Sequence, residues 1–125
     1  GAKWATKMAE LDGYIFVTAE YNHSIPGVLK NALDHAHAEY NRKPAAFVGY
    51  GGVGGARAVE QLRLILAELQ IATLKHAVHI NANELVPLMK SEKTFADFPY
   101  LGEAANTMLD QLVWWASALK TARAA

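Results

Sequence analysis

Six consecutive residues, Gly49-Tyr50-Gly51-Gly52-Val53-Gly54, have the spacing G-x-G-x-x-G, whose chemistry is the binding of phosphate groups. They follow an apolar run and precede a helical pattern, so the motif alone predicts a dinucleotide pyrophosphate at a helix N-terminus. The usual acidic ribose partner would stand near the end of the next strand, where Asn81-Ala82-Asn83 occurs instead. A tight turn, which glycines permit for steric reasons, therefore remains an alternative to phosphate binding.

A second segment that could do chemistry begins at Thr18. Its start, Thr18-Ala19-Glu20-Tyr21-Asn22-His23-Ser24, places a carboxylate, an aromatic ring and an amide side by side after another apolar run. An aromatic wall with a few donors and acceptors is what a flat ring ligand requires. Plainer interpretations stay open: Tyr21 as an ordinary loop aromatic, Asn22 as the residue of a left-handed turn, and Ser24 as a helix cap, which we favour over ligand contact.

The elements that must position these loops alternate between helix and strand. Apolar spacing predicts helices at 3–11, from about 24 to 40, at 56–70 and at 103–122, strands at 13–18, 45–50 and 74–80, and mostly loop at 81–100. Strict alternation with strands buried on both faces predicts an α/β fold with a parallel sheet. The loops 19–25 and 50–55 then lie at the carboxyl ends of strands, where such sheets bind ligands.

The two loops together resemble those of a known family. The run from Thr18 to Asp34 is similar to the P-E-Y-N-x-S-x-P-x-x-L-K-N-A-x-D stretch of NADPH-dependent FMN reductases, which include quinone, azo-dye and chromate reductases. The run from Tyr50 through Arg57 resembles that family's S-Y-G-G-x-x-G-G-x-R-A segment. The resemblance extends from about Trp4 to Ile80, in the same order and spacing.

The resemblance implies a flavodoxin-like three-layer α/β/α fold and an oxidoreductase that uses FMN, with NADPH or NADH as reductant. Hydride would pass through the flavin to a small-molecule acceptor such as a flavin or a quinone, and no side chain is a compulsory acid or base. Ala19 replaces the family's usual proline and Gly49 its usual serine. The residues expected to bind the cofactor are Glu20, Tyr21, Asn22, Ser24, Tyr50, Gly51 and Gly52.

Members of the family begin with a strand and a G-S-x-R-x-x-S-type loop that holds the FMN phosphate. Residues 1–125 are therefore expected to form a single, partial domain that lacks the first β-α-β portion. The strand at 13–18 corresponds to the family's third strand, so its outer edge is expected to be unpaired and apolar. A further segment, another chain or oligomerisation is expected to cover it.

Composition narrows the classes of function. Twelve basic residues balance twelve acidic ones without clusters, which disfavours nucleic-acid and membrane partners, and no apolar run is long enough to span a bilayer. There are no cysteines, and the histidine pairs point apart, so no metal site is predicted. We expect a cytoplasmic homo-oligomer, a dimer or tetramer by resemblance. The alternatives are a flavodoxin-type electron carrier and a flavin-free fragment or interaction module of the same fold.

Overall fold

The computed structural model describes the whole chain, residues 1–125, and its centre is a parallel sheet of four strands. These are β1 (Tyr14–Thr18), β2 (Lys43–Tyr50), β3 (Ile71–Thr73) and β4 (Val78–Ile80). One side of β2 pairs with β1, while its other side pairs with β3 near its beginning and with β4 near its end. Every pairing is parallel, so the α/β fold expected from the alternating pattern is confirmed.

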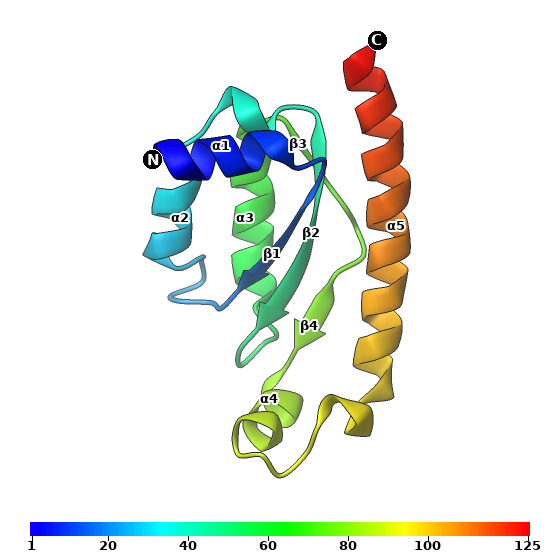
Figure 1. Cartoon of the computed structure of the whole chain (residues 1–125). Helices are drawn as coiled ribbons and strands as arrows, with labels where there is room; N and C mark the ends of the chain where they lie inside the picture. Colours follow the sequence, from blue (N-terminus) through cyan, green and yellow to red (C-terminus); the bar gives the residue numbers. More distant parts are fainter.

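Helices cover the sheet on two faces (Figure 1). On one face lie α1 (Ala2–Glu10), α2 (Gly27–Leu33) and α3 (Ala56–Glu68), and on the other lies the long helix α5 (Pro99–Ala124). Successive strand residues point to opposite faces, so Phe47 joins the core under α3, whereas Ala46 joins the core under α5. The result is the three-layer α/β/α arrangement.

The C-terminal end of α5 is tied to the amino-terminal end of the sheet. Arg123 donates to the backbone carbonyl of Arg42 (2.7 Å) and to Oδ1 of Asp12 (2.8 Å), and Lys120 pairs with the same carboxylate (3.2 Å). These contacts hold α5 along the sheet, from the tips of β2 and β4 to their beginnings (Figure 1). No helix of the chain combines the length and the apolar composition needed to cross a bilayer.

Strand β1 differs from the expectation that both its faces are buried. Tyr14, Phe16 and Thr18 are buried, but Ile15 and Val17, on the face toward α5, are 42% and 63% exposed. The reason is that α5 packs over β2 and β4 and leaves this face of β1 uncovered. The outer edge of β1 pairs with no strand among residues 1–125, as expected from the sequence.

The helix predicted from about 24 to 40 is much shorter in the structure. Helix α2 ends at Leu33, and only a short 3-10 turn, Ala38–Tyr40, follows it. The tertiary contacts of Tyr40 explain the break: its side chain is fully buried, donates to the carbonyl of Leu33 (3.0 Å) and accepts from the indole of Trp4 (2.7 Å). Burial of this ring under α1 outweighs the continuation of the helix.

The segment after α3 was also predicted incorrectly. Of the strand expected at 74–80, only 78–80 is a strand, β4, because the chain leaves the sheet between Leu74 and Ala77; β3, at Ile71–Thr73, was not predicted. The loop expected at 81–100 contains helix α4 (Ala82–Met89), which begins where Glu84 Oε1 accepts the backbone N–H of Asn81 (2.9 Å). This capping interaction could have been predicted from the sequence, because the polar N-cap residue Asn81 stands three positions before Glu84.

Candidate functional site

The two loops singled out in the sequence lie side by side. Strands β1 and β2 are parallel neighbours in register, with Thr18 opposite Gly49, so the segments that follow them leave the same edge of the sheet. Figure 1 shows each loop at the carboxyl end of its strand, with the first to the left of the tip of β1 and the second beneath the tip of β2 in that view. The expectation that loops 19–25 and 50–55 lie at the carboxyl ends of neighbouring strands is therefore confirmed.

The first loop contains a tight reverse turn. Tyr21 and Ser24 exchange two backbone hydrogen bonds (2.9 and 3.0 Å), and the two central residues, Asn22 and His23, have positive φ angles of 51° and 71°. Positive φ at both central positions is the geometry of the turns that close tight hairpins, and asparagine tolerates it well. The interpretation of Asn22 as a left-handed turn residue is confirmed.

Ser24 does not cap the following helix, contrary to the interpretation we favoured. The N-cap of α2 is Pro26, and no side chain makes a capping hydrogen bond there. The backbone of Ser24 is instead committed to the turn with Tyr21. The turn sets where the helix begins, and sequence propensity alone does not show it.

Glu20 links the first loop to the helix that follows the second. Its Oε1 accepts the backbone N–H groups of Arg57 (2.9 Å) and Ala58 (3.0 Å), in the first turn of α3, and its Oε2 pairs with the guanidinium of Arg57. Desolvation opposes ionisation of Glu20, but these hydrogen bonds and the charge of Arg57 outweigh it and hold the pKa of the carboxyl below its usual range. The Glu20 side chain is thus an internal anion at the start of α3.

This contact excludes the pyrophosphate interpretation of the glycine motif. A dinucleotide would need the free N–H groups of the first turn of α3, and the carboxylate of Glu20 already accepts two of them. A turn built by close packing explains the glycines. A Cβ at Gly55, whose φ is +63°, would lie 2.8 Å from the backbone nitrogen of Tyr50, and a Cβ at Gly49 would lie 2.6 Å from the carbonyl oxygen of Gly54.

Three further residues hold these loops in place: Arg57, His79 in β4 and Asn81 just after β4. Their roles were not predicted from the sequence. The Nη1 group of Arg57 lies 2.9 Å from Nε2 of His23, so the same guanidinium holds both Glu20 and the reverse turn. From the other side, Nδ1 of His79 lies 2.7 Å from the carbonyl oxygen of Gly54. Asn81 stands beside Gly54, where an added Cβ would meet its Oδ1 at 2.8 Å. Arg57 was visible as a motif position, whereas the histidine contacts arise only from folding.

Both loops present unused backbone donors to the outside. The N–H groups of Asn22 and His23 in the first loop, and of Gly52 and Val53 in the second, donate no hydrogen bond within the chain, and all four residues are exposed. The space around Gly52 is open, with nothing within 4 Å of an added Cβ. The side chains of Tyr21 and Tyr50 are also exposed there. Free amides, open backbone and flat side chains are the donor set that the edge of an isoalloxazine ring requires, so the residues fit FMN.

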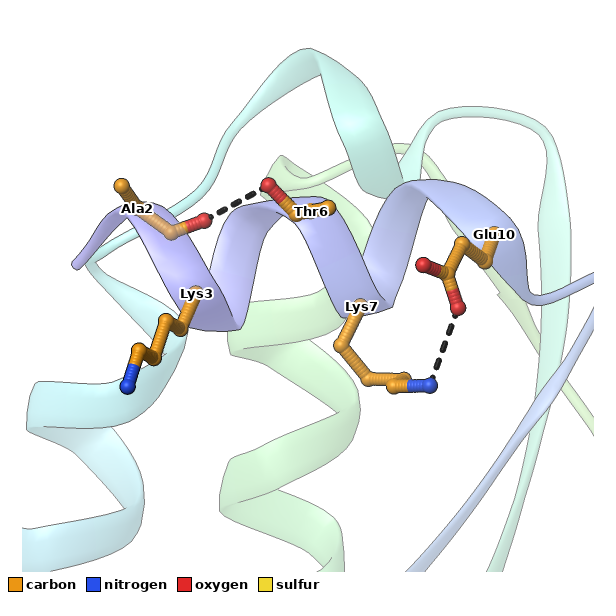
Figure 2. Close-up of a pocket in the computed structure, with 5 residues that line it drawn as sticks. All are labelled: Ala2, Lys3, Thr6, Lys7 and Glu10. Atoms are coloured by element: carbon orange, nitrogen blue, oxygen red, sulfur yellow. Dashed lines mark hydrogen bonds and ion pairs between the residues drawn. The ribbon is translucent and has the colours of Figure 1, made fainter.

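The other surface features are less suited to chemistry. A shallow hollow of about 270 Å³ lies along the outer side of α1, where Thr6 bonds to its own helix and Lys7 pairs with Glu10 (Figure 2). All its lining residues belong to this one exposed helix, far from both loops in Figure 1. Lys30 on α2 and Asp34 at its C-terminal end form a surface ion pair (2.8 Å), which needs no ligand to explain it. The structure gathers no cluster of three histidine or acidic side chains that could hold a metal.

Comparison with known proteins gives one family. The family model described as NADPH-dependent FMN reductase matches residues 1–84, the part of the chain that carries both loops. An NAD(P)H-dependent FMN reductase of Schizosaccharomyces pombe is 34% identical over 115 residues, covering 81% of this chain and 58% of the relative. An NAD(P)H:quinone oxidoreductase of Solanum tuberosum is 38% identical over 96 residues, covering 73% of this chain and 50% of the relative.

A solved structure agrees with these relatives. The flavoenzyme NAD(P)H:(acceptor) oxidoreductase FerB from Paracoccus denitrificans superposes with a TM-score of 0.54 at 29% identity, over 59% of this chain and 44% of that protein. The chain thus spans about half the length of the proteins it matches. The flavodoxin-like fold is confirmed, and contact of FMN with Glu20, Tyr21, Asn22, Ser24, Tyr50, Gly51 and Gly52 stays a prediction. Because the family model matches residues 1–84, about two thirds of the chain, the chain belongs to the NADPH-dependent FMN reductase family.

Proposed function

We propose that this chain supplies the flavin-ring part of an NAD(P)H-dependent oxidoreductase, which reduces a small-molecule acceptor such as a flavin or a quinone. The observation that carries the proposal is the pair of adjacent loops at the tips of β1 and β2, with free N–H groups at Asn22, His23, Gly52 and Val53. FMN, when bound, supplies the chemistry of accepting hydride from the nicotinamide and passing it on. The relatives described above are named for reactions of this class.

The chain's own residues bind and orient rather than take part in covalent steps. The four free amides can donate to the polar edge of the ring, and the exposed rings of Tyr21 and Tyr50 can border its flat surface. Gly51, with φ of +144°, holds a backbone conformation that side chains rarely adopt, and so brings the second loop close to a ligand. Glu20 and Arg57 keep the two loops at a fixed distance.

Two alternative functions, an electron carrier and a flavin-free interaction module, can be distinguished from the reductase. A flavodoxin-type electron carrier usually docks through a strongly acidic surface, and this chain has twelve basic and twelve acidic residues. A flavin-free interaction module is favoured by one feature, the open and apolar outer edge of β1. The colour of the purified protein distinguishes this module from both flavoproteins, because a retained flavin is yellow.

The proposal is tested by fluorescence titration of FMN with the native chain and with Gly52→Ala. The added methyl group meets no protein atom within 4 Å, so the variant should fold normally, yet it occupies the space that the ring would approach. Overpacking of this kind costs about 1–3 kcal/mol, so we expect roughly tenfold weaker flavin binding. Gly27→Ala is the matched control, since its Cβ also meets nothing and Gly27 lies outside the loops. Equal binding by all three proteins would contradict the proposed site.

Catalysis is tested by NADPH oxidation in the presence of FMN and menadione. We expect turnover that requires flavin and that distinguishes the reductase from an electron carrier, which accepts electrons without using NADPH directly.

We further propose that the protein acts in the cytoplasm as a homo-oligomer. The uncovered side chains of Ile15 and Val17, and the exposed Trp114 on α5, support association.

A further inference from the structure

The largest hollow of the chain has an apolar lining and lies between the sheet and the start of α5. Its volume is about 560 Å³, within the range of small-molecule sites. Strand residues form its floor, and the segment from η2 (Phe95–Asp97) into α5 forms its wall. No charged or hydrogen-bonding side chain lines it; the residues that matter here are Val48, Val78, Ile80, Phe95, Leu101 and Ala105. We call it the α5 groove.

The groove lies next to the proposed flavin-ring site. Val48 lies on its floor, and Tyr50, two residues further along β2, points to the same face of the sheet. Ile80, another floor residue, is the register partner of Tyr50 and accepts the backbone N–H of Gly51 (3.2 Å). A ligand at the second loop would therefore lie next to the apolar floor of the groove, through Ile80 beside Tyr50.

The chemistry of the lining selects the class of ligand. A pocket without any polar side chain offers no side-chain hydrogen bonds to offset the desolvation of a polar ligand group. Each ligand methylene that leaves water, in contrast, makes the binding free energy more favourable. A sugar, a phosphate or a second nucleotide would leave its polar groups unpaired there. A hydrocarbon chain would not.

We propose that the α5 groove binds the hydrocarbon tail of a quinone acceptor whose ring lies beside the flavin ring, next to the glycine loop. This inference rests on the proposed reductase function and adds the substrate class: quinones with an alkyl or prenyl tail in preference to polar, tailless ones. In the reaction the quinone takes up a hydride and a proton and becomes a hydroquinone, while NADPH is oxidised to NADP⁺. The tail contributes binding and takes no part in the electron transfer.

Equilibrium dialysis of the full chain, with and without FMN, measures this preference directly. The probes are menadione and menadione carrying a decyl chain on its free ring carbon. Because each buried methylene is worth roughly a fourfold gain in affinity, we expect the decyl compound to bind about tenfold tighter or more. Equal affinity of the two probes for the native chain would overturn the inference.

Two substitutions in α5 assign the gain to the groove. Gly102 lines the groove, and a Cβ there meets nothing within 4 Å, so Gly102→Leu adds apolar side-chain volume at the groove wall. The affinity ratio of the two probes should then fall toward one. Thr107→Leu is the matched control, because Thr107 is exposed on the same helix and does not line the groove. An unchanged ratio in Gly102→Leu, or the same loss in Thr107→Leu, would contradict the assignment.

The outcomes separate this inference from the proposed function. If FMN fails to bind and menadione is not reduced, the reductase proposal fails, while dialysis without flavin still reports on the groove. If menadione is reduced but the tail brings no gain, only the groove assignment fails. Decanol serves as a third probe: if it binds as tightly as decyl-menadione, the groove takes any alkyl chain and its assignment to a quinone is wrong.

Discussion

The carboxylate of Glu20 accepts the backbone N–H of Ala58 at 3.0 Å, across 38 positions of sequence. This contact joins the loop after β1 to the helix after β2, so the two segments that we assign to the flavin ring cannot move independently. The same carboxylate occupies the N-terminus of α3, where the glycine motif alone would have placed a phosphate. One acidic side chain thus both fixes the site and excludes the competing interpretation.

The first prediction concerns this carboxylate. Glu20→Gln keeps the shape of the side chain but loses the charge, so the hydrogen bonds to Arg57 and Ala58 weaken and Tm should fall. Glu60→Gln is the control, since Glu60 is exposed and makes only a loose pair with Arg63 at 3.6 Å. A Tm for Glu20→Gln equal to that of the control would show that the contact does not stabilise the fold.

The same group predicts a dependence of stability on pH. The folded-state pKa of Glu20 lies below its ordinary value of 4.5, so its contribution is present above that pH and is lost as the pH falls through the folded-state pKa. The difference in Tm between the native chain and Glu20→Gln should therefore shrink on acidification from pH 6 toward pH 3. Thermal unfolding followed by circular dichroism measures it. A difference that grows at low pH has the wrong sign.

Lys43 should be important for anchoring α1. Its side chain is buried, and its Nζ donates to the carbonyls of Met8 (3.0 Å) and Ala9 (3.1 Å) at the end of that helix. Burial lowers the pKa of Lys43, which shows the desolvation that these contacts offset. Lys43→Met should lose about 1–3 kcal/mol of stability in urea denaturation. Lys7→Met, on the exposed side of α1, should change it by no more than about 0.5 kcal/mol.

Restoring the family's serine at position 49 should destabilise this chain. A Cβ at Gly49 would lie 2.6 Å from the carbonyl oxygen of Gly54 and 3.2 Å from Val59, so the glycine loop would have to move away from β2. Overpacking of a tight site costs about 1–3 kcal/mol. Urea denaturation of Gly49→Ser beside Gly27→Ser, whose Cβ has open space, tests this. Equal stability of the two variants would mean that the loop adapts freely.

The uncovered face of β1 should drive association. Ile15→Lys and Val17→Lys in one chain place charges on the side of the strand that faces solvent, so the core is preserved while the apolar surface is lost. We expect a smaller mass by light scattering at high concentration than for the native chain. Val28→Lys, a change at the most exposed large apolar residue of the opposite layer, is the control. A loss of association in this control alone would place the interface on α2 instead.

Several features followed from the sequence because they depend on neighbours along the chain. The apolar runs and helical spacing predicted the strand–helix alternation, and the parallel sheet follows from that alternation. The parallel sheet in turn required the two loops to share one edge. The left-handed turn at Asn22 was predictable for the same reason, since a tight turn involves residues that are close along the chain.

Contacts between distant residues decided the rest. Burial of Tyr40 under Trp4 ended α2 early, and the turn between Tyr21 and Ser24 removed the cap that propensity favoured. Above all, the chain position of Glu20 gives no sign that its carboxylate would reach the start of α3. Local pattern fixes which residues form strands and turns, because it reflects steric and hydrophobic periodicity; which polar groups meet depends on how the layers pack, because burial makes each of them find a partner.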